Sequence, residues 1–269
     1  LDPEHTAEEA MERASVIIDC TPKGIGHKNK VDYFKQFQGN TLGFVAQGTE
    51  YGFGKMYARG INDEALVREE DRFLHIVSCN THNIAVLVKQ LGLGPDGTNH
   101  LVDGRFLCLR RANDISQDSG FVASPTVEPH NDAKFGTHHA RDAHTLFETL
   151  GYDLNIFSSA LKLNTQYMHS IHFALTLDHD ITLDEVKERL MASTRVAVTY
   201  KRSANQVFSF GRDHGYYGRI MSQTVVSLDT LAVRNGNEVV GFSFTPQDGN
   251  PLLSTVAAML WYLDPETID

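Results

Sequence analysis

The hydrophobic pattern changes character along the chain. Residues 15–20 form a short, nearly all-apolar run, which predicts a strand buried on both faces of a parallel sheet. Similar runs at 43–47 and 73–77 are separated from it by turn-rich or polar segments. From residue 104 onward the runs are longer and alternate between apolar and polar positions, as in 168–178, which is typical of antiparallel strands with one covered face. We therefore expect an α/β part followed by an α+β part.

Capping patterns and periodicity predict three helices. Residues 6–9 and 182–185 match the capping box, so they are expected to open a helix up to about residue 14 and an amphipathic helix over 182–193. The apolar stretch 252–262 follows a proline and predicts a closing helix.

Composition narrows the class of partner. The chain of 269 residues has a formal net charge of −10, which argues against a nucleic acid or an anionic membrane as the main partner. No apolar run approaches the roughly 20 residues that a membrane-spanning helix needs, and the N-terminus has no signal-peptide pattern. Three cysteines form no disulfide framework, so we expect a reducing compartment, the cytoplasm.

One cysteine lies where covalent chemistry is favoured. The tetrapeptide SCNT at 78–81, with Cys79 in second place, directly follows the apolar run 73–77, and the residues after it are predicted to be helical. A helix N-terminus favours the thiolate, and small polar neighbours offer N–H groups to an oxyanion. Taken alone, the tetrapeptide fits a buried structural cysteine equally well. Cys20 and Cys108 lie within apolar runs and are expected to be in the core.

Seven segments, in matching order, resemble motifs of type II (archaeal-type) glyceraldehyde-3-phosphate dehydrogenases. They are DCTPKGIG at 19–26 with Asn29 and Lys30, Gln47–Gly48, VSCNT at 77–81, RRAND at 110–114, Thr137-His138-His139 with Asp142, TQYMH at 165–169, and Gln247–Asp248. Each match is weak by itself, but together they cover almost the whole chain.

The resemblance implies a mechanism for Cys79 and His169. Cys79 would attack an aldehyde carbon, and His169 would be the base that ionises the thiol and removes the hydroxyl proton. In a period-two strand His169 shares its face with the apolar residues at 171, 173, 175 and 177, so we expect it to be buried. From the residues alone, a core histidine satisfied by a backbone carbonyl is the better interpretation. His172 falls on the opposite face and is the weaker candidate.

The resemblance also implies substrates and cofactor. The reaction would be the reversible, phosphorylating oxidation of D-glyceraldehyde 3-phosphate to 1,3-bisphosphoglycerate with NADP or NAD, so the partners would be a small phosphorylated aldehyde and inorganic phosphate, in a homotetramer. The substrate-binding residues would be Ser78, Asn80, Thr81, His138, His139 and Arg111. The cofactor-binding residues would be Gly48, Thr49, Arg110, Gln247, Thr21 and Pro22. The planar guanidinium group of arginine can donate two parallel hydrogen bonds to a phosphate, although an Arg-Arg pair is usually a solvated surface feature.

The same resemblance predicts the domain organisation. Residues 1–78, with 248–269 returning to them, would form part of a Rossmann-type nucleotide-binding domain. Residues 79–247 would form a catalytic domain with a mostly antiparallel sheet. The family begins with a strand, a glycine-rich turn and a helix that hold the dinucleotide pyrophosphate. No such segment is found before residue 15, so we expect the native protein to be longer, or this part to come as a separate piece.

Some positions depart from the family pattern. His82 and Asn83 stand where the family has threonine and glycine, and Thr49 replaces the second glycine of a turn. Because asparagine does not freely replace a glycine that lets backbone approach a ligand, phosphate binding is expected to be altered. A related thioester-forming semialdehyde dehydrogenase and a catalytically silent paralogue that serves as a binding subunit are the alternative functions.

Two other patterns carry no function. Residues 92–97 satisfy GxGxxG, but they follow a helix-like segment and contain a proline, so we expect a helix C-cap and a turn. The histidines at 138, 139 and 144, with His130 nearby, match no recognised zinc spacing, and we expect no metal.

Overall fold

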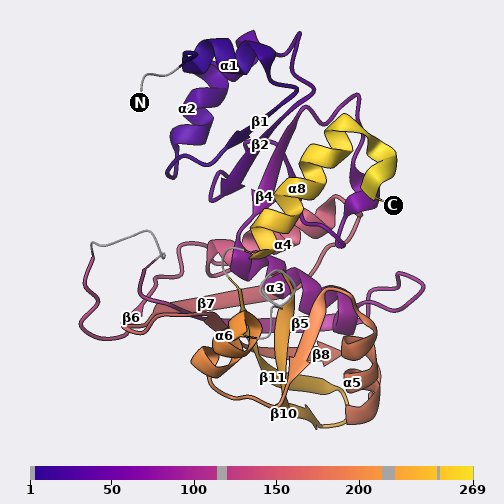
Figure 1. The fold of residues 1–269 in the computed structure, drawn as a ribbon. Coiled ribbons are helices and arrows are strands. Elements are labelled where there is room, and N and C mark those ends of the chain that lie inside the picture. Colours follow the sequence, from indigo (N-terminus) through magenta and orange to yellow (C-terminus); the bar gives the residue numbers. More distant parts are fainter. Residues whose placement is uncertain (1–3, 114–119, 214–221, 247–248, 269) are drawn as a thin grey trace. The chain divides into compact units, whose positions relative to one another are not determined.

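The computed structural model describes residues 4–113, 120–213, 222–246 and 249–268 (Figure 1). The chain forms two compact units. The first unit contains Leu1–Ser78 and Pro251–Asp269, and the second contains Cys79–Asn250. Within the described residues, no helix is both long enough and apolar enough to cross a membrane.

The first unit is built on a four-stranded parallel sheet. The strands are β1 (Val16–Asp19), β2 (Gly43–Gly48), β3 (Lys55–Tyr57) and β4 (Phe73–Val77), in the order β1-β2-β4-β3. The helices are α1 (Ala7–Arg13), α2 (Ile25–Asp32) and α8 (Gly249–Leu263), with short turns η1 (Phe34–Gln36), η2 (Asp63–Ala65) and η4 (Pro265–Ile268). The predicted parallel sheet is confirmed, and so is the capping box of α1, in which Thr6 and Glu9 bond each other's backbone N–H groups.

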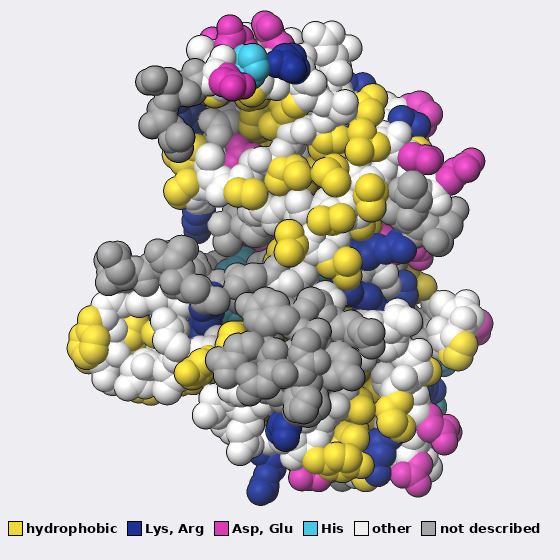
Figure 2. All heavy atoms as spheres, viewed as in Figure 1, with side chains coloured by type: hydrophobic (Ala, Val, Ile, Leu, Met, Phe, Trp, Pro, Cys, Tyr) yellow, Lys and Arg dark blue, Asp and Glu magenta, His cyan; other side chains and the backbone are white. Residues whose placement is uncertain are grey.

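Apolar side chains cover both faces of this sheet. Because successive residues of a strand point to opposite faces, Phe44 and Val45 of β2 lie in two different clusters, and both are fully buried. On one face α8 contributes Trp261 and Tyr262. Tyr262 leaves no room for a side chain at Gly43, where a Cβ would lie 2.1 Å from the ring. The outer side of α8 is also apolar, with exposed residues Leu252, Val256, Leu260 and Leu263, and Figure 2 shows hydrophobic side chains gathered over this helix.

The edge strand β1 differs from the prediction. Val16 and Ile17 are half-buried, Ile18 is 38% exposed, and Cys20, directly after the strand, is exposed. The expectation of a strand buried on both faces and of a core Cys20 is therefore wrong. The physical reason is position: among the described strands β1 pairs with β2 alone, so it is covered less than a central strand.

The second unit contains a seven-stranded mixed sheet. The strands are β5 (Leu101–Arg110), β6 (Thr126–Val127), β7 (Ile156–Lys162), β8 (His169–Leu177), β9 (Val196–Thr199), β10 (Thr224–Arg234) and β11 (Glu238–Thr245), in the order β6-β7-β5-β8-β11-β10-β9. Among these strands, β5 pairs with β7 and β9 with β10 in parallel, and the other four pairings are antiparallel. The helices are α3 (Cys79–Leu87), the π-helical turn η3 (Val88–Gly92), α4 (His138–Glu148), α5 (Leu183–Ala192) and α6 (Ala204–Asp213).

Several local predictions for this unit are confirmed. Alternate residues of β8, from His169 to Leu177, are buried, as the period-two pattern requires. The capping box predicted at the start of α5 is present, with Thr182 and Glu185 bonding each other's backbone. Cys108 is fully buried in β5. Gly92 ends η3, and a turn follows it, closed by the N–H of Gly97 donating to the carbonyl of Gly94 at 3.0 Å.

Candidate active site

Cys79 is the first residue of α3, and it follows the end of β4 after the single residue Ser78. The side chain is half-buried, whereas the eight helical residues after it, including Asn80 and Thr81, are all buried. The first turn of a helix leaves backbone N–H groups without intrahelical partners and carries a partial positive charge. The thiol therefore lies where a negative sulfur or an oxyanion is stabilised.

A chain of hydrogen bonds connects the residue after Cys79 to α4 and β7. The amide nitrogen of Asn80 lies 3.4 Å from Nε2 of His139, whose Nδ1 lies 3.0 Å from Oγ1 of Thr137. Thr137 in turn contacts the hydroxyl of Ser158 at 2.7 Å, and Ser158 accepts the backbone N–H of Ala140 at 3.0 Å. Because these groups are buried and bonded in series, they hold His139 in one orientation.

Burial has a different consequence for each of Asn80 and His139. The side-chain oxygen of Asn80 is buried without a hydrogen-bond partner, which is costly unless a ligand supplies one. His139 is kept neutral, because burial, followed by the charges of His138, Arg110 and His169, holds its pKa well below the usual value.

His169 is the first residue of β8, and only 5% of it is exposed. Its Nδ1 accepts the backbone N–H of Arg111 at 2.9 Å. Burial, followed by the charges of Arg111 and Arg110, lowers its pKa to about 3. At neutral pH the ring is therefore uncharged, with its proton on Nε2. A backbone N–H rather than a carbonyl satisfies this histidine, so Nε2 acts as a donor.

The two adjacent arginines have different surroundings. Arg110, the last residue of β5, forms an ion pair with Glu128. Arg111 is 6% exposed, and its backbone is bonded to His169. Taken together, the contacts in the second unit connect Asn80 to His139 and Arg111 to His169, and His138, Arg110 and His169 are close enough to His139 to disfavour its protonation.

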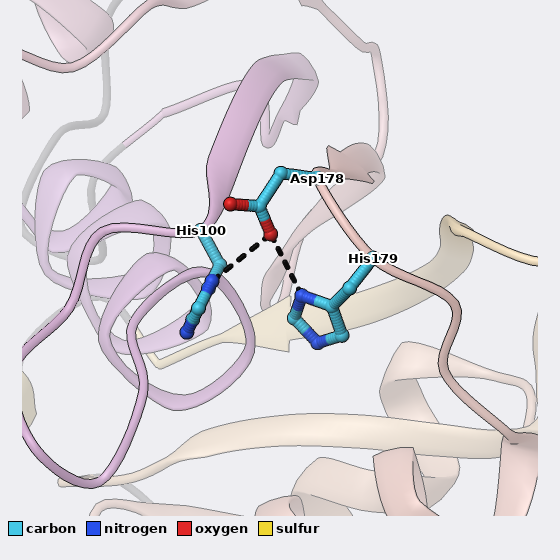
Figure 3. A group of neighbouring side chains, drawn as sticks. All are labelled: His100, Asp178 and His179. Carbon is cyan, nitrogen blue, oxygen red and sulfur yellow. Dashed lines mark hydrogen bonds and ion pairs between the residues drawn. The ribbon is translucent and has the colours of Figure 1, made fainter.

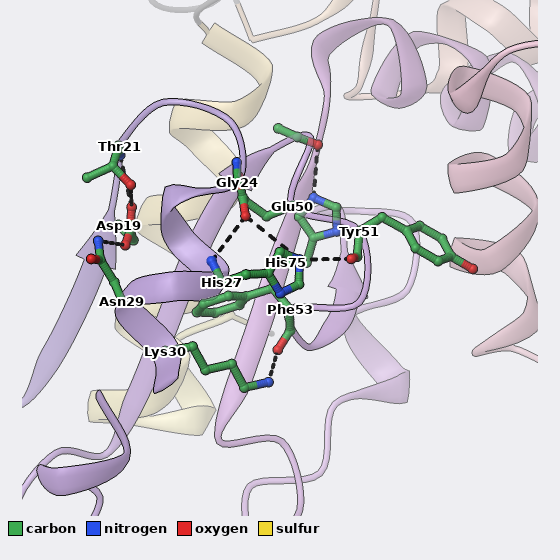
Figure 4. Close-up of polar contacts among 11 residues, drawn as sticks. Asp19, Thr21, Gly24, His27, Asn29, Lys30, Glu50, Tyr51, Phe53 and His75 are labelled. Carbon is green, nitrogen blue, oxygen red and sulfur yellow. Dashed lines mark hydrogen bonds and ion pairs between the residues drawn. The ribbon is translucent and has the colours of Figure 1, made fainter. Parts of the chain in front are cut away.

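The residues that the resemblance assigned to the cofactor lie mostly in the first unit. Thr21 and Pro22 follow β1 and are exposed. Asp19 organises this turn, because its carboxylate accepts the backbone N–H and the hydroxyl of Thr21 and the amide of Asn29 at 2.8 Å (Figure 4). The spacing of Asp19, Thr21 and Asn29 in the motif thus has a local structural cause. Gln247 lies outside the described residues.

Gly48 and Thr49 lie at the carboxyl end of β2. Gly48 has a φ of +70°, and no atom lies within 4 Å of the place where a Cβ would stand, so its backbone is open to a ligand. Its carbonyl accepts Nε2–H of His75 at 2.9 Å, and Thr49 is exposed. Nearby, Glu50 accepts the N–H groups of Gly24 and His27 at the start of α2 (Figure 4). Ligands of parallel sheets bind at carboxyl ends of this kind, so the segment fits a dinucleotide.

Comparisons with known proteins point to one group of enzymes. Glyceraldehyde-3-phosphate dehydrogenase of Methanobacterium formicicum is 27% identical over 196 residues, which are 71% of this chain and 53% of that protein. The protein of the same name from Pyrobaculum arsenaticum is 26% identical over 243 residues, covering 89% of this chain and 67% of its own length. Glyceraldehyde-3-phosphate dehydrogenase 2 of Methanosarcina barkeri is 29% identical over 221 residues, with coverages of 77% and 58%.

This chain is related to archaeal glyceraldehyde-3-phosphate dehydrogenases. It spans about half the length of the first of these relatives. No family model matches it.

Asn83, where the resemblance implies a glycine, links α3 to the seven-stranded sheet of the second unit. Its amide nitrogen donates to Oγ1 of Thr245 at 2.5 Å, and its oxygen accepts the hydroxyl of Ser243 at 3.0 Å. Thr245 lies opposite His169 in the β8–β11 ladder. Asn83 therefore ties the helix that carries Cys79 to the strand position beside His169. Ser243 and Thr245 lie 160 and 162 positions from Asn83, so no local pattern predicts these contacts.

The three thiols are expected to react with iodoacetamide in a definite order, Cys79 first. Cys108 is fully buried, and burial raises the pKa of its thiol. Cys20 is exposed, but partial burial of its thiol and the charge of Asp19 raise its pKa. Cys79 is half-buried at a helix N-terminus, where the thiolate is favoured. Time-resolved peptide mass spectrometry measures the order, and labelling of Cys20 before Cys79 would count against an activated Cys79.

Proposed function

We propose that the chain carries the catalytic unit of a phosphorylating glyceraldehyde-3-phosphate dehydrogenase of the archaeal type, which converts D-glyceraldehyde 3-phosphate to 1,3-bisphosphoglycerate reversibly. The observation that carries the proposal is the position of Cys79 as the first residue of α3, next to the buried Asn80–His139 pair. The relationship to archaeal glyceraldehyde-3-phosphate dehydrogenases supports the choice of substrate.

Cys79 provides the nucleophile in this proposal. Its thiolate sulfur bonds to the aldehyde carbon, and the carbonyl electron pair moves to the oxygen, which becomes an alkoxide. A nicotinamide, when bound, supplies the acceptor for the hydride of this carbon. The product on Cys79 is a thioester. A phosphate oxygen then attacks the thioester carbon, the carbon–sulfur bond breaks, and Cys79 leaves as the thiolate.

We assign His169 to the reacting oxygen as a hydrogen-bond donor. Its Nδ1 already accepts the N–H of Arg111, and its low pKa makes it a weak base near neutral pH. Donation from Nε2 stabilises the alkoxide, from which hydride leaves without prior removal of a proton. This role differs from the base that the resemblance implies.

The phosphate groups of the substrates need donors and positive charge. Arg111, which carries a positive charge, and His138 are the candidates. In neutral His139, Nε2 faces the amide nitrogen of Asn80 and accepts, so its N–H is on Nδ1 and donates to Thr137; His139 would therefore act by positioning Asn80. Ser78 directly precedes the nucleophile, and Thr81 lies two positions after it; both carry hydroxyl groups. The unsatisfied oxygen of Asn80 is suited to accept a substrate hydroxyl.

The cofactor, NADP or NAD, is proposed to bind the first unit. Gly48, with its open backbone, and Thr49 lie at the end of β2, and Thr21 and Pro22 lie at the end of β1. Gln247 and Arg110 complete the set that the resemblance implies, although Arg110 would have to share its charge with Glu128.

Two assays test the function separately. In the first, the protein is given D-glyceraldehyde 3-phosphate with NADP or NAD, and reduced cofactor is expected to form faster when inorganic phosphate is present. Aspartate semialdehyde in place of the sugar phosphate tests the related semialdehyde dehydrogenase. Faster reaction with that aldehyde would contradict the proposed substrate.

The second assay needs no cofactor. Incubation with 1,3-bisphosphoglycerate is expected to acylate Cys79 and release phosphate, because acyl transfer reverses the last step of the proposed reaction. Mass spectrometry of the Cys79 peptide measures the added group. A protein that neither becomes acylated nor reduces cofactor would be the catalytically silent paralogue.

A further inference from the structure

A second group of ligating side chains lies at one end of the β5–β8 ladder, and none of its members belongs to the site around Cys79 (Figure 3). His100 directly precedes β5, whereas Asp178 and His179 directly follow β8. Leu101 pairs with Leu177 in this antiparallel ladder, so the three residues reach the same end of the sheet.

The three side chains converge on one carboxylate oxygen. Oδ1 of Asp178 lies 2.9 Å from Nδ1 of His100 and 2.8 Å from Nδ1 of His179. One ligand atom from each residue lies within 4.8 Å of the other two. Figure 3 shows the Asp178 carboxylate between the two imidazole rings. Among the residues that the structure describes, this is the group whose donors are close enough to share an ion.

The backbone holds this group in place. The N–H of Asp178 donates to the carbonyl of His100 at 3.0 Å, and the N–H of His100 donates to the carbonyl of Gly92 at 2.9 Å. On the other side, the N–H of Leu177 donates to the carbonyl of Asn237 at 3.0 Å. Ligands fixed on the ends of paired strands lose little freedom when an ion binds, which favours affinity.

We propose that His100, Asp178 and His179 bind a divalent transition-metal ion, with Zn²⁺ as the best-fitting ion. Two imidazoles and one carboxylate form a donor set that suits Zn²⁺ and leaves its fourth position to water. Tetrahedral Zn²⁺ needs nitrogen and oxygen ligands about 3.3 Å apart, so the observed separations have to widen by only about half an ångström. When the ion binds, each imidazole carries its proton on Nε2 and turns the lone pair of Nδ1 to the metal.

The surroundings favour a cation. Asp96 lies close enough to His100, and Glu185 close enough to His179, for their charges to interact. The three ligands are also accessible, with side-chain exposures of 29% for His100, 50% for Asp178 and 35% for His179. An ion from solution can therefore reach the site, and an open coordination position stays hydrated. The bound ion would stabilise the end of the β5–β8 ladder. This proposal does not depend on the function proposed for Cys79.

The test uses a background in which Cys20 and Cys79 are both replaced by serine, because accessible thiols also bind Zn²⁺. Isothermal titration with Zn²⁺ is expected to show one bound equivalent, which EDTA removes, and a rise of several degrees in melting temperature. His100→Gln and His179→Gln are each expected to weaken Zn²⁺ binding by at least about a hundredfold. Loss of a residue that only supports a ligand weakens metal affinity by up to about a hundredfold, and loss of a ligand itself is expected to cost at least as much. His130→Gln is the matched control, because His130 is an exposed histidine of the same unit whose ring lies 3.0 Å from Ser159.

A further variant separates ligation from folding. Asp178→Asn keeps an oxygen that accepts from both imidazoles but removes the charge, so the apo protein is expected to keep its melting temperature and lose Zn²⁺ affinity. The visible spectrum of the Co²⁺ form reports tetrahedral nitrogen and oxygen ligands independently of stability. Equal Zn²⁺ binding by His100→Gln, His179→Gln and His130→Gln would overturn the proposal, and so would an absence of saturable binding in the background protein.

Discussion

Replacement of Cys79 by serine is expected to reduce both aldehyde oxidation and acyl transfer by about a thousandfold or more. Serine has nearly the same shape, but its hydroxyl does not ionise near neutral pH, so the helix N-terminus has no anion to stabilise. Because Cys79 is half-buried, the variant is expected to keep the melting temperature of the unsubstituted protein. The rate of cofactor reduction and the mass of the Cys79 peptide after exposure to 1,3-bisphosphoglycerate measure the effect.

Cys20→Ser is the control for this prediction. Cys20 is an exposed thiol of the first unit, after β1, and is not expected to take part in catalysis. Its replacement should leave both rates within about twofold. If Cys79→Ser retained a tenth of the original rate, the nucleophile would have to be another group, and the proposed mechanism would be wrong.

Acidification is expected to weaken the folded state because folded His169 resists protonation. Its pKa is lowered from 6.5 to about 3 by burial and by the neighbouring arginine charges. Between these values the unfolded chain binds a proton that the folded chain does not, so the free energy of unfolding rises with pH. The contribution of His169 to stability is therefore lost as the pH falls. His169 alone accounts for about 2 kcal/mol between about pH 7.5 and about pH 5.

The measurement is urea unfolding at several pH values for the unsubstituted protein and for His169→Gln, in which glutamine still offers an oxygen to the Arg111 N–H. Buried Asp142 acts in the opposite direction, because its pKa is raised from 3.8 to about 6 and its contribution is lost as the pH rises. Because both proteins contain Asp142, its effect cancels when the free energy of unfolding of one protein is subtracted from that of the other. His172→Gln, on the opposite face of β8, is the control for replacing a histidine in this strand. Parallel curves for the unsubstituted protein and His169→Gln would contradict the prediction.

The candidate site was predictable from the sequence only in its local part. The apolar run of β4 followed by a small polar tetrapeptide placed Cys79 at a strand-to-helix junction, and α3 begins at that residue. The period-two pattern of β8 also predicted that His169 is buried. Its protonation state was not predictable, because it depends on an N–H group 58 positions away.

What the sequence by itself determined is local. The apolar run of β2, the alternation of β8 and the capping boxes of α1 and α5 arise from neighbouring residues, whose spacing is set by the geometry of a single strand or helix. The positions of these elements could therefore be predicted from the sequence, and the structure has them there.

What only the tertiary structure decided depends on contacts between residues far apart in the chain. The exposure of Cys20 follows from the place of β1 at the edge of its sheet, and the bonds of Asn83 follow from the packing of α3 on β11. The meeting of His100 with Asp178 follows from the pairing of β5 with β8. Strand order and helix packing are set by burial summed over the whole unit, and no single segment contains that information.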